Sequence, residues 1–325
     1  MSPAREALER HQVVIYLAAI AAGSALGLAW PQEEAHLERL IYPALTLLLY
    51  ASFSQVPFAA LREALRDRRF MGALLVANFV AVPLLVLTLG PLLPPDAGQR
   101  LGVFLVLLAP CTDWFVAFTH LGKGDVRRAV AALPWLLLLQ LILLPVYLWL
   151  FLGEAFVGVA DATAFGRAFA QFILLPLALA YLTQRLARRH LALRGFLHRL
   201  AWWPVPLLAL TLFPIAGSHV TAVLEGGKLL AQVVPVFVLY ALLAAPLARF
   251  VAARFGLPPE AARTLAYSLG SRNSFVVLPL ALALPEELSL AVATIVIQSL
   301  VELVALTVYL WWVPGVLIPG PGRRP

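Results

Sequence analysis

One stretch of five residues combines three side chains that could bind a small polar solute. It reads APCTD at 109–113, and it places a thiol (Cys111), a hydroxyl (Thr112) and a carboxylate (Asp113) in a segment that is otherwise strongly apolar. A thiolate is a soft ligand that suits trivalent arsenic or antimony better than hard cations. An aspartate at membrane depth costs at least ~2.5–3.5 kcal/mol to insert, so Asp113 indicates function.

A second polar stretch follows about 160 residues later. It reads LGSRN at 269–273 and contains Ser271, Arg272 and Asn273. Proline in the first stretch and glycine in the second both predict an interrupted membrane helix, which is tolerated where the break lines a cavity. Paired broken helices form the substrate site in many transporters. We expect the two breaks to cross, to bind substrate and to bring Asp113 close to Arg272.

Two further polar residues lie at matching positions of later helices. Gln140 opens QLILLPVYLW and Glu302 opens ELVALTVYLW. The predicted core then holds Asp113, Arg272 and Glu302, so one carboxylate is left after pairing. Burial favours the protonated form of a carboxylate, which makes the leftover group a natural proton carrier. We therefore predict that Asp113, Glu302 and Gln140 handle the coupling ion.

The choice between protons and sodium depends on Arg272. A sodium ion within about 4 Å of its guanidinium would be repelled by roughly 4 kcal/mol at an effective dielectric near 20. The sequence therefore favours coupling to protons, with substrate and proton competing for one cavity.

The composition predicts an integral membrane protein. Of the 325 residues 62% are hydrophobic and 13% are charged, and the mean hydropathy is +0.89, far above a soluble domain. The net charge of +7 does not indicate nucleic-acid binding, because the basic residues lie in short gaps between apolar runs. A single cysteine excludes an intramolecular disulfide and a multi-thiolate metal centre. We expect no cofactor and no enzymatic activity; GKGD at 122–125 lacks the spacing of a phosphate loop.

Ten segments are long enough for a membrane helix. They lie near 12–30, 40–60, 70–90, 100–120, 128–152, 163–184, 200–219, 228–250, 261–284 and 287–313. Lysine and arginine collect at both termini and in alternate gaps, whereas acidic residues collect in the other gaps. Since basic loops face the cytoplasm, we expect a multi-pass protein of the cell membrane with both termini cytoplasmic, and a first helix that is retained.

The two halves are related by a weak repeat. ALTL at 44 returns at 209, Pro-Leu at 83 returns at 246, and the polar stretches and the two YLW segments align in the same frame. Five spans in each half make the repeat inverted. We therefore predict an all-α fold of five plus five helices, with repeats at 1–160 and 161–325 and with broken, crossing helices 4 and 9.

Three stretches resemble a known family. CTDWFVAFTHLGKGD from Cys111, GSRNSFVVLPLALAL from Gly270 and VELVALTVYL from Val301 are similar to the arsenite efflux carriers of the arsenical-resistance permease type, within the bile acid, arsenite and riboflavin transporter superfamily. The resemblance implies a panel domain and a core domain, each formed across both halves. It also implies an essential cysteine at Cys111 and efflux of arsenite or antimonite, and the charges described above favour protons as the coupling ion.

Other functions stay open at this stage. Val276 stands where arsenite carriers place a glutamate. The sodium-coupled bile acid branch carries a glutamate and a glutamine around its ninth-helix break, and the nearest equivalents here are Ser268 and Arg272. The first alternative is therefore a carrier of organic anions, with Arg272 clamping a carboxylate. The second is a membrane sensor or scaffold without transport. Direction, stoichiometry and oligomeric state are not predicted.

Overall fold

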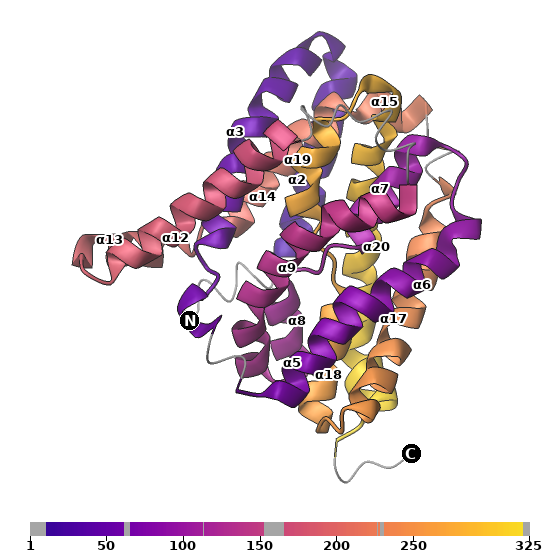
Figure 1. Ribbon diagram of the computed structural model, residues 1–325. Coiled ribbons are helices and arrows are strands. Elements are labelled where there is room, and N and C mark those ends of the chain that lie inside the picture. Colours follow the sequence, from indigo (N-terminus) through magenta and orange to yellow (C-terminus); the bar gives the residue numbers. More distant parts are fainter. Residues whose placement is uncertain are drawn as a thin grey trace. The chain divides into compact units, whose positions relative to one another are not determined.

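The computed structural model describes residues 11–61, 66–112, 114–152, 166–225, 227 and 231–320. In this part of the chain the regular structure is helical, and the β-type pairing is one isolated bridge (Figure 1). Five helices are long and apolar enough to cross a membrane, or up to seven if each of two bent pairs counts as one span.

Large apolar side chains are exposed along these helices. They include Leu84 (57%), Ile142 (64%), Trp149 (61%), Val304 (67%) and Trp311 (63%). Such surfaces are stable against lipid, because the hydrocarbon core of a bilayer is as apolar as these side chains. The chain is therefore a multi-pass membrane protein.

The chain divides into two compact units, each built from a segment of each half. The first unit comprises Met1–Gln55 and Ala162–Lys228, and the second comprises Val56–Asp161 and Leu229–Pro325. The predicted repeats at 1–160 and 161–325 cut across this division, and they stay a prediction.

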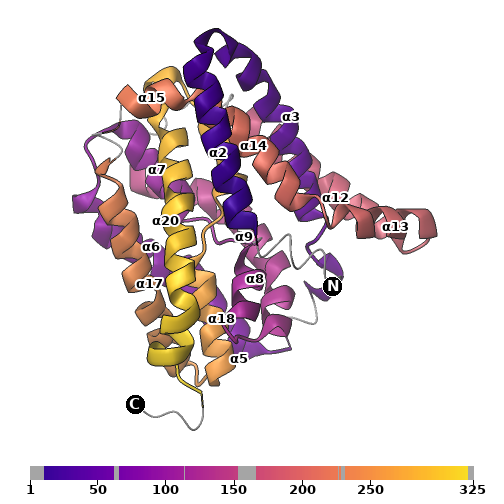
Figure 2. The ribbon, with the colours of Figure 1, turned by 180° about the vertical axis from the view of Figure 1, so that it is seen from behind.

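The first unit is a group of apolar helices. In chain order these are α2 (Gln12–Ala29), α3 (Glu34–Phe53), α12 (Leu175–Ala187), α13 (Leu191–Leu200), α14 (Pro204–Ser218) and α15 (Val220–Glu225). Helix α14 packs against α2 and α3, and Figure 2 shows α2 beside α14. Between α2 and α3 the chain turns by 111°.

Glycines allow the close approach of α2 and α14. A Cβ atom added to Gly23 would lie 2.1 Å from the carbonyl oxygen of Phe213, and one added to Gly27 would lie 2.1 Å from that of Gly217. Small residues are enriched at membrane helix contacts for this reason, because they let two backbones gain van der Waals contact.

The second unit contains the longer helices and both predicted breaks. Its helices are α5 (Arg68–Val76), α6 (Val82–Leu89), α7 (Ala97–Leu107), α8 (Trp114–Leu121), α9 (Val126–Leu152), α17 (Val234–Arg254), α18 (Pro259–Gly270), α19 (Ser274–Leu282) and α20 (Leu290–Trp312). A π-helical turn, η3 (Ala77–Ala81), joins α5 to α6.

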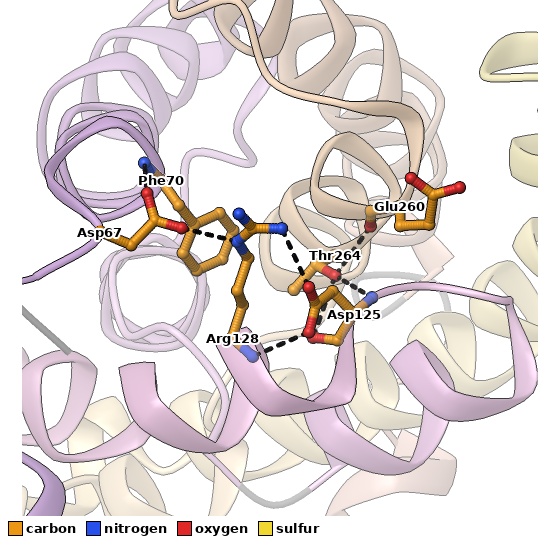
Figure 3. Close-up of polar contacts among 6 residues, drawn as sticks. All are labelled: Asp67, Phe70, Asp125, Arg128, Glu260 and Thr264. Carbon is orange, nitrogen blue, oxygen red and sulfur yellow. Dashed lines mark hydrogen bonds and ion pairs between the residues drawn. The ribbon is translucent and has the colours of Figure 1, made fainter. Parts of the chain in front are cut away.

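A polar cluster ties the starts of three helices together at one end of this unit (Figure 3). Arg128 of α9 donates to Asp67, the N-cap of α5, over 2.7 Å and to Asp125 over 2.9 Å. The Asp125 N–H in turn contacts the Thr264 hydroxyl at 2.7 Å and the Glu260 carbonyl oxygen at 3.3 Å, both on α18. The cluster thereby joins α5, α9 and α18, and α18 ends at one of the two breaks.

Candidate functional site

Two helices of the second unit are interrupted at the polar stretches. Helix α7 ends at Leu107 and α8 begins at Trp114, while α18 ends at Gly270 and α19 begins at Ser274. Proline and glycine account for both ends: Pro110 has no N–H to continue a helix, and Gly270 weakens the last turn of α18.

The two interruptions lie against each other. Pro110 and Arg272 form the isolated antiparallel bridge. The Cys111 N–H donates to the Ser271 carbonyl over 3.3 Å, and the Asn273 N–H donates to the Ala109 carbonyl over 2.8 Å. These bonds pair backbone groups that a broken helix would otherwise leave unsatisfied at membrane depth. We call this region the crossing.

Four helix ends meet at the crossing. The C-terminal ends of α7 and α18 carry partial negative charge, and the N-terminal ends of α8 and α19 carry partial positive charge. The arrangement therefore offers one pole that favours a cation and another that favours an anion or a polar oxygen.

Arg272 occupies the negative pole. Its side chain donates from Nε to the Ser271 carbonyl (2.8 Å), from Nη1 to the Leu107 carbonyl (3.3 Å), and from Nη2 to Asn78 Oδ1 (2.9 Å) and the Ser268 carbonyl (2.5 Å). Only 2% of the residue is exposed. The guanidinium is thus enclosed by four oxygen atoms, and it is not presented to a cavity as a two-pronged anion clamp.

Glu302 binds the backbone of Arg272 instead of its guanidinium. Its Oε2 accepts from the Arg272 N–H (2.9 Å) and from Gln298 Nε2 (2.6 Å), while Gln298 Oε1 accepts from the Ser274 hydroxyl (2.8 Å). The second oxygen, Oε1, is buried and has no hydrogen-bond partner among the described residues. A chain of hydrogen bonds thus runs from α19 through α20 to the break.

The positive pole is lined by the other predicted residues. The Trp114 N–H donates to the Cys111 sulfur over 3.3 Å, and the Val276 N–H donates to Asn273 Oδ1 over 3.3 Å. Asn273 Nδ2 also donates to the Thr112 hydroxyl over 3.3 Å. These side chains occupy the first turns of α8 and α19, where N-caps satisfy free N–H groups.

Comparison with known families then identifies the class of protein. Residues 42–226, more than half of the chain, match the model of the sodium bile acid symporter family. The chain belongs to that family. No curated protein matches it.

Membership makes the chain a membrane transporter, of the organic-anion or the arsenite type. It also supports the resemblance at the level of the superfamily, while the arsenite subtype remains for the proposal below. Members of this family are transporters and not enzymes.

One predicted residue of this symporter-family chain, Gln140, is not brought into the crossing by any hydrogen bond among the described residues. Gln140 of α9 is buried, and both polar atoms of its amide have no partner among the described residues. Asp113 lies outside the described residues, so its predicted pairing with Arg272 is untested.

Sequence reasoning missed two residues that hold the crossing. Asn78, in the π-helical turn η3, accepts from Arg272 and donates to the Ser268 hydroxyl over 2.9 Å. It is a lone amide in an apolar run, which is a signal for an interhelical hydrogen bond. Gln298 lies one helical turn before Glu302, a spacing that places both on one face.

Proposed function

We propose that this transporter exports arsenite or antimonite in exchange for protons. The observation that carries the proposal is the position of Cys111, whose sulfur lies at the first turn of α8, at the positive pole of the crossing. A sulfur ligand favours a thiophilic centre such as trivalent arsenic.

The rest of the substrate site is supplied by polar groups. A small oxyacid presents hydroxyl groups, and the Thr112 hydroxyl, one residue after Cys111, accepts a hydrogen bond from the Asn273 amide of the other break. The described residues contain no group of three His, Cys, Asp or Glu side chains that could hold a metal ion. Binding therefore rests on one sulfur and several hydrogen bonds, which allows the release that transport requires.

The coupling proton belongs on Glu302 in this proposal, with Asp113 and Gln140 as further members of the pathway. Glu302 Oε1 and both amide atoms of Gln140 are buried without described partners. Buried polar atoms of this kind are normally satisfied by water or by a proton-bearing group. Replacement of Glu302 by glutamine keeps the acceptor for the Arg272 N–H, and it should abolish the uptake of substrate into everted vesicles that an imposed pH gradient drives.

A carrier of organic anions is the second candidate. The name of the family and the two helix N-termini at the crossing both favour an anionic solute. Against it, Arg272 uses its donors within the protein. Uptake assays with radiolabelled taurocholate and with arsenite, on the same vesicles, would separate the two candidates.

The thiol provides the decisive test. Cys111→Ala should abolish arsenite resistance in a sensitive host while the protein reaches the membrane at normal levels. Cys111→Ser is the matched control, because it keeps the size and polarity of the side chain but not the soft ligand. Full resistance in both variants would reduce Cys111 to a packing role, whereas a wild-type protein that confers no resistance would remove arsenite as the substrate.

We further propose ten spans in two inverted sets of five, with both termini cytoplasmic. Support comes from the helix order: α2, α3, α5–α6, α7–α8 and α9 in one half, and α12, α14, α17, α18–α19 and α20 in the other. Single cysteines in a Cys111→Ser background test it with an impermeant maleimide on intact cells. Positions 34 and 286 should react and positions 123 and 188 should not; labelling at 188 would contradict the topology.

A further inference from the structure

The negative pole of the crossing has the composition of a cation site. Leu107 is the last residue of α7, and Ser268 lies in the last turn of α18. Their carbonyl oxygens point at one position, together with those of Ser271 and the Asn78 amide. Transporters use unwound carbonyls and the C-terminal ends of half-helices to bind a coupling cation.

The ligands are of the type that hard cations prefer. Three are main-chain carbonyl oxygens and one is an amide oxygen, which resemble the uncharged oxygen ligands of hard metal ions. Asn78, Leu107, Ser268 and Ser271 are each 0% exposed. Water therefore does not compete at their oxygens.

The sodium ion that the family name implies does not fit this site, because the guanidinium of Arg272 fills it. The four oxygens lie 2.5–3.3 Å from the guanidinium nitrogens, and a second cation there would share its acceptors with a fixed positive charge. Among the described residues, no carboxylate oxygen lies within 4.0 Å of that guanidinium to offset the charge.

We propose that Arg272 is a built-in cation that replaces a dissociable coupling sodium at the crossing. The planar fork of a guanidinium can donate to several oxygens at once, and it never dissociates or loses its charge at physiological pH. The centroid of the Tyr240 ring lies 5.9 Å from Arg272 Cζ, so the ring adds a cation–π interaction that favours the positive charge. The crossing is then held closed by a tethered charge, and the transporter does not depend on sodium. The consequence for transport rests on the proposed carrier function, whereas the site itself does not.

The test measures sodium binding by stability, so that it does not need a known substrate. The purified full chain in detergent is melted in NaCl and in choline chloride at equal ionic strength, as wild type, Arg272→Gln, Arg272→Lys and Arg263→Gln. Arg263 is the matched control: it is a second buried arginine, it lies on α18, and it donates to the carbonyls of Ile318 and Lys123 instead of to the oxygens around Arg272.

We expect the wild type and Arg272→Lys to melt at the same temperature in both salts, because a cation is already present. Arg272→Gln should be less stable in choline and should recover with NaCl in a saturable way, by roughly 5 °C at a hundredfold excess over its Kd. Arg263→Gln should be destabilised equally in both salts.

Two results would overturn the proposal. One is saturable stabilisation of the wild type by sodium, which is measurable even if Arg272→Gln cannot be purified. The other is an Arg272→Gln variant that is indifferent to sodium. If transport by the wild type fails for every substrate tested, the proposed function is wrong, but these melting results still decide the cation site.

Discussion

The α2–α14 contact of the first unit and the crossing of the second unit are both sites of close backbone approach, but they are stabilised differently. At the α2–α14 contact, Gly23 and Gly27 lie directly against main-chain oxygens of α14. Nearby polar side chains of α14, such as Thr211 and Ser218, bond to carbonyls of their own helix. At the crossing, the segments are joined by hydrogen bonds from Arg272, Asn273 and their neighbours.

This difference distinguishes a structural contact, α2–α14, from a candidate binding site, the crossing. Apolar side chains gain little from leaving lipid, so membrane helices associate through small residues or through polar bonds. Small residues give a dry contact that needs no ordered water, and they offer no polar side chain that could bind a solute. A polar crossing is less tolerant of change, but it provides the groups that recognise substrate and ions. Three variants test this contrast and a fourth tests the polar cluster around Arg128, from the largest expected effect to the smallest.

Gly27→Ala should cost the most. Its Cβ would lie 2.1 Å from the Gly217 oxygen, so the helices must separate, and overpacking of this kind costs about 3 kcal/mol. Hydrogen exchange should rise in peptides of α2 and α14 but not in those of α7 and α18. Gly195→Ala, on α13 with open space around it, is the control and should be neutral. Equal melting temperatures for both variants would contradict the close contact.

Asn78→Leu should come next, at about 2 kcal/mol, because a hydrogen bond to a charged group is lost and a buried N–H of Arg272 is left unpaired. The melting temperature and the exchange of α18 peptides measure this loss. Ser268→Ala is the control: it removes the other partner of Asn78 but keeps the main-chain carbonyl that Arg272 uses. A cost in the control as large as in Asn78→Leu would assign the effect to Ser268.

Asn273→Ala should cost about 1 kcal/mol, the usual value of a lost N-cap. The variant removes the acceptor for the Val276 N–H and the donor to Thr112 together. Asn273→Ser keeps a capping oxygen but loses the amide group that donates to Thr112, so the difference between the two variants isolates the cap. If both variants melt like the wild type, the first turn of α19 does not depend on Asn273.

Asp67→Asn should have the smallest effect, below about 1 kcal/mol, because its ion pair with Arg128 is partly exposed. Partial burial by itself raises the pKa of Asp67, but hydrogen bonds from the Phe70 N–H and Arg128 and nearby positive charge outweigh it, so the pKa lies below its ordinary value. Stabilisation from a lowered pKa is present above the pKa of the unfolded state and is lost as the pH falls through the folded value.

The difference in melting temperature between wild type and Asp67→Asn should therefore shrink as the pH is lowered from 7 towards 3. Asp96→Asn is the control, since Asp96 caps α7 in the same way and has no ion pair among the described residues. A difference that grows on acidification would contradict the assigned shift.

Much of the architecture could be predicted from the pattern of residues along the chain. Proline, glycine and polar side chains inside apolar runs located the interruptions near 110 and 270, because each of these features is locally incompatible with a continuous membrane helix. The number of spans does not follow from helix length in the same way, because the interrupted helices are short. Helices α7, α18 and α19 contain 11, 12 and 9 residues, below the length that crosses a membrane.

The partners of Arg272 could not be predicted in the same way. Sequence reasoning paired the guanidinium with a carboxylate, because charges are the visible candidates. Three of its four partners are main-chain carbonyls, which every residue has, and the fourth is Asn78, 194 residues away along the chain.

The sequence by itself thus determined that the chain lies in a membrane, where its helices break, and that Cys111, Thr112, Ser271, Arg272 and Asn273 lie at the breaks. Only the tertiary structure decided which helix ends meet and which oxygens enclose the guanidinium. The physical reason is that helix breaking is a local property of a few residues. Enclosure of a charge depends instead on where carbonyls from distant segments converge. Every residue has a main-chain carbonyl, so the residue types do not indicate which carbonyls will meet.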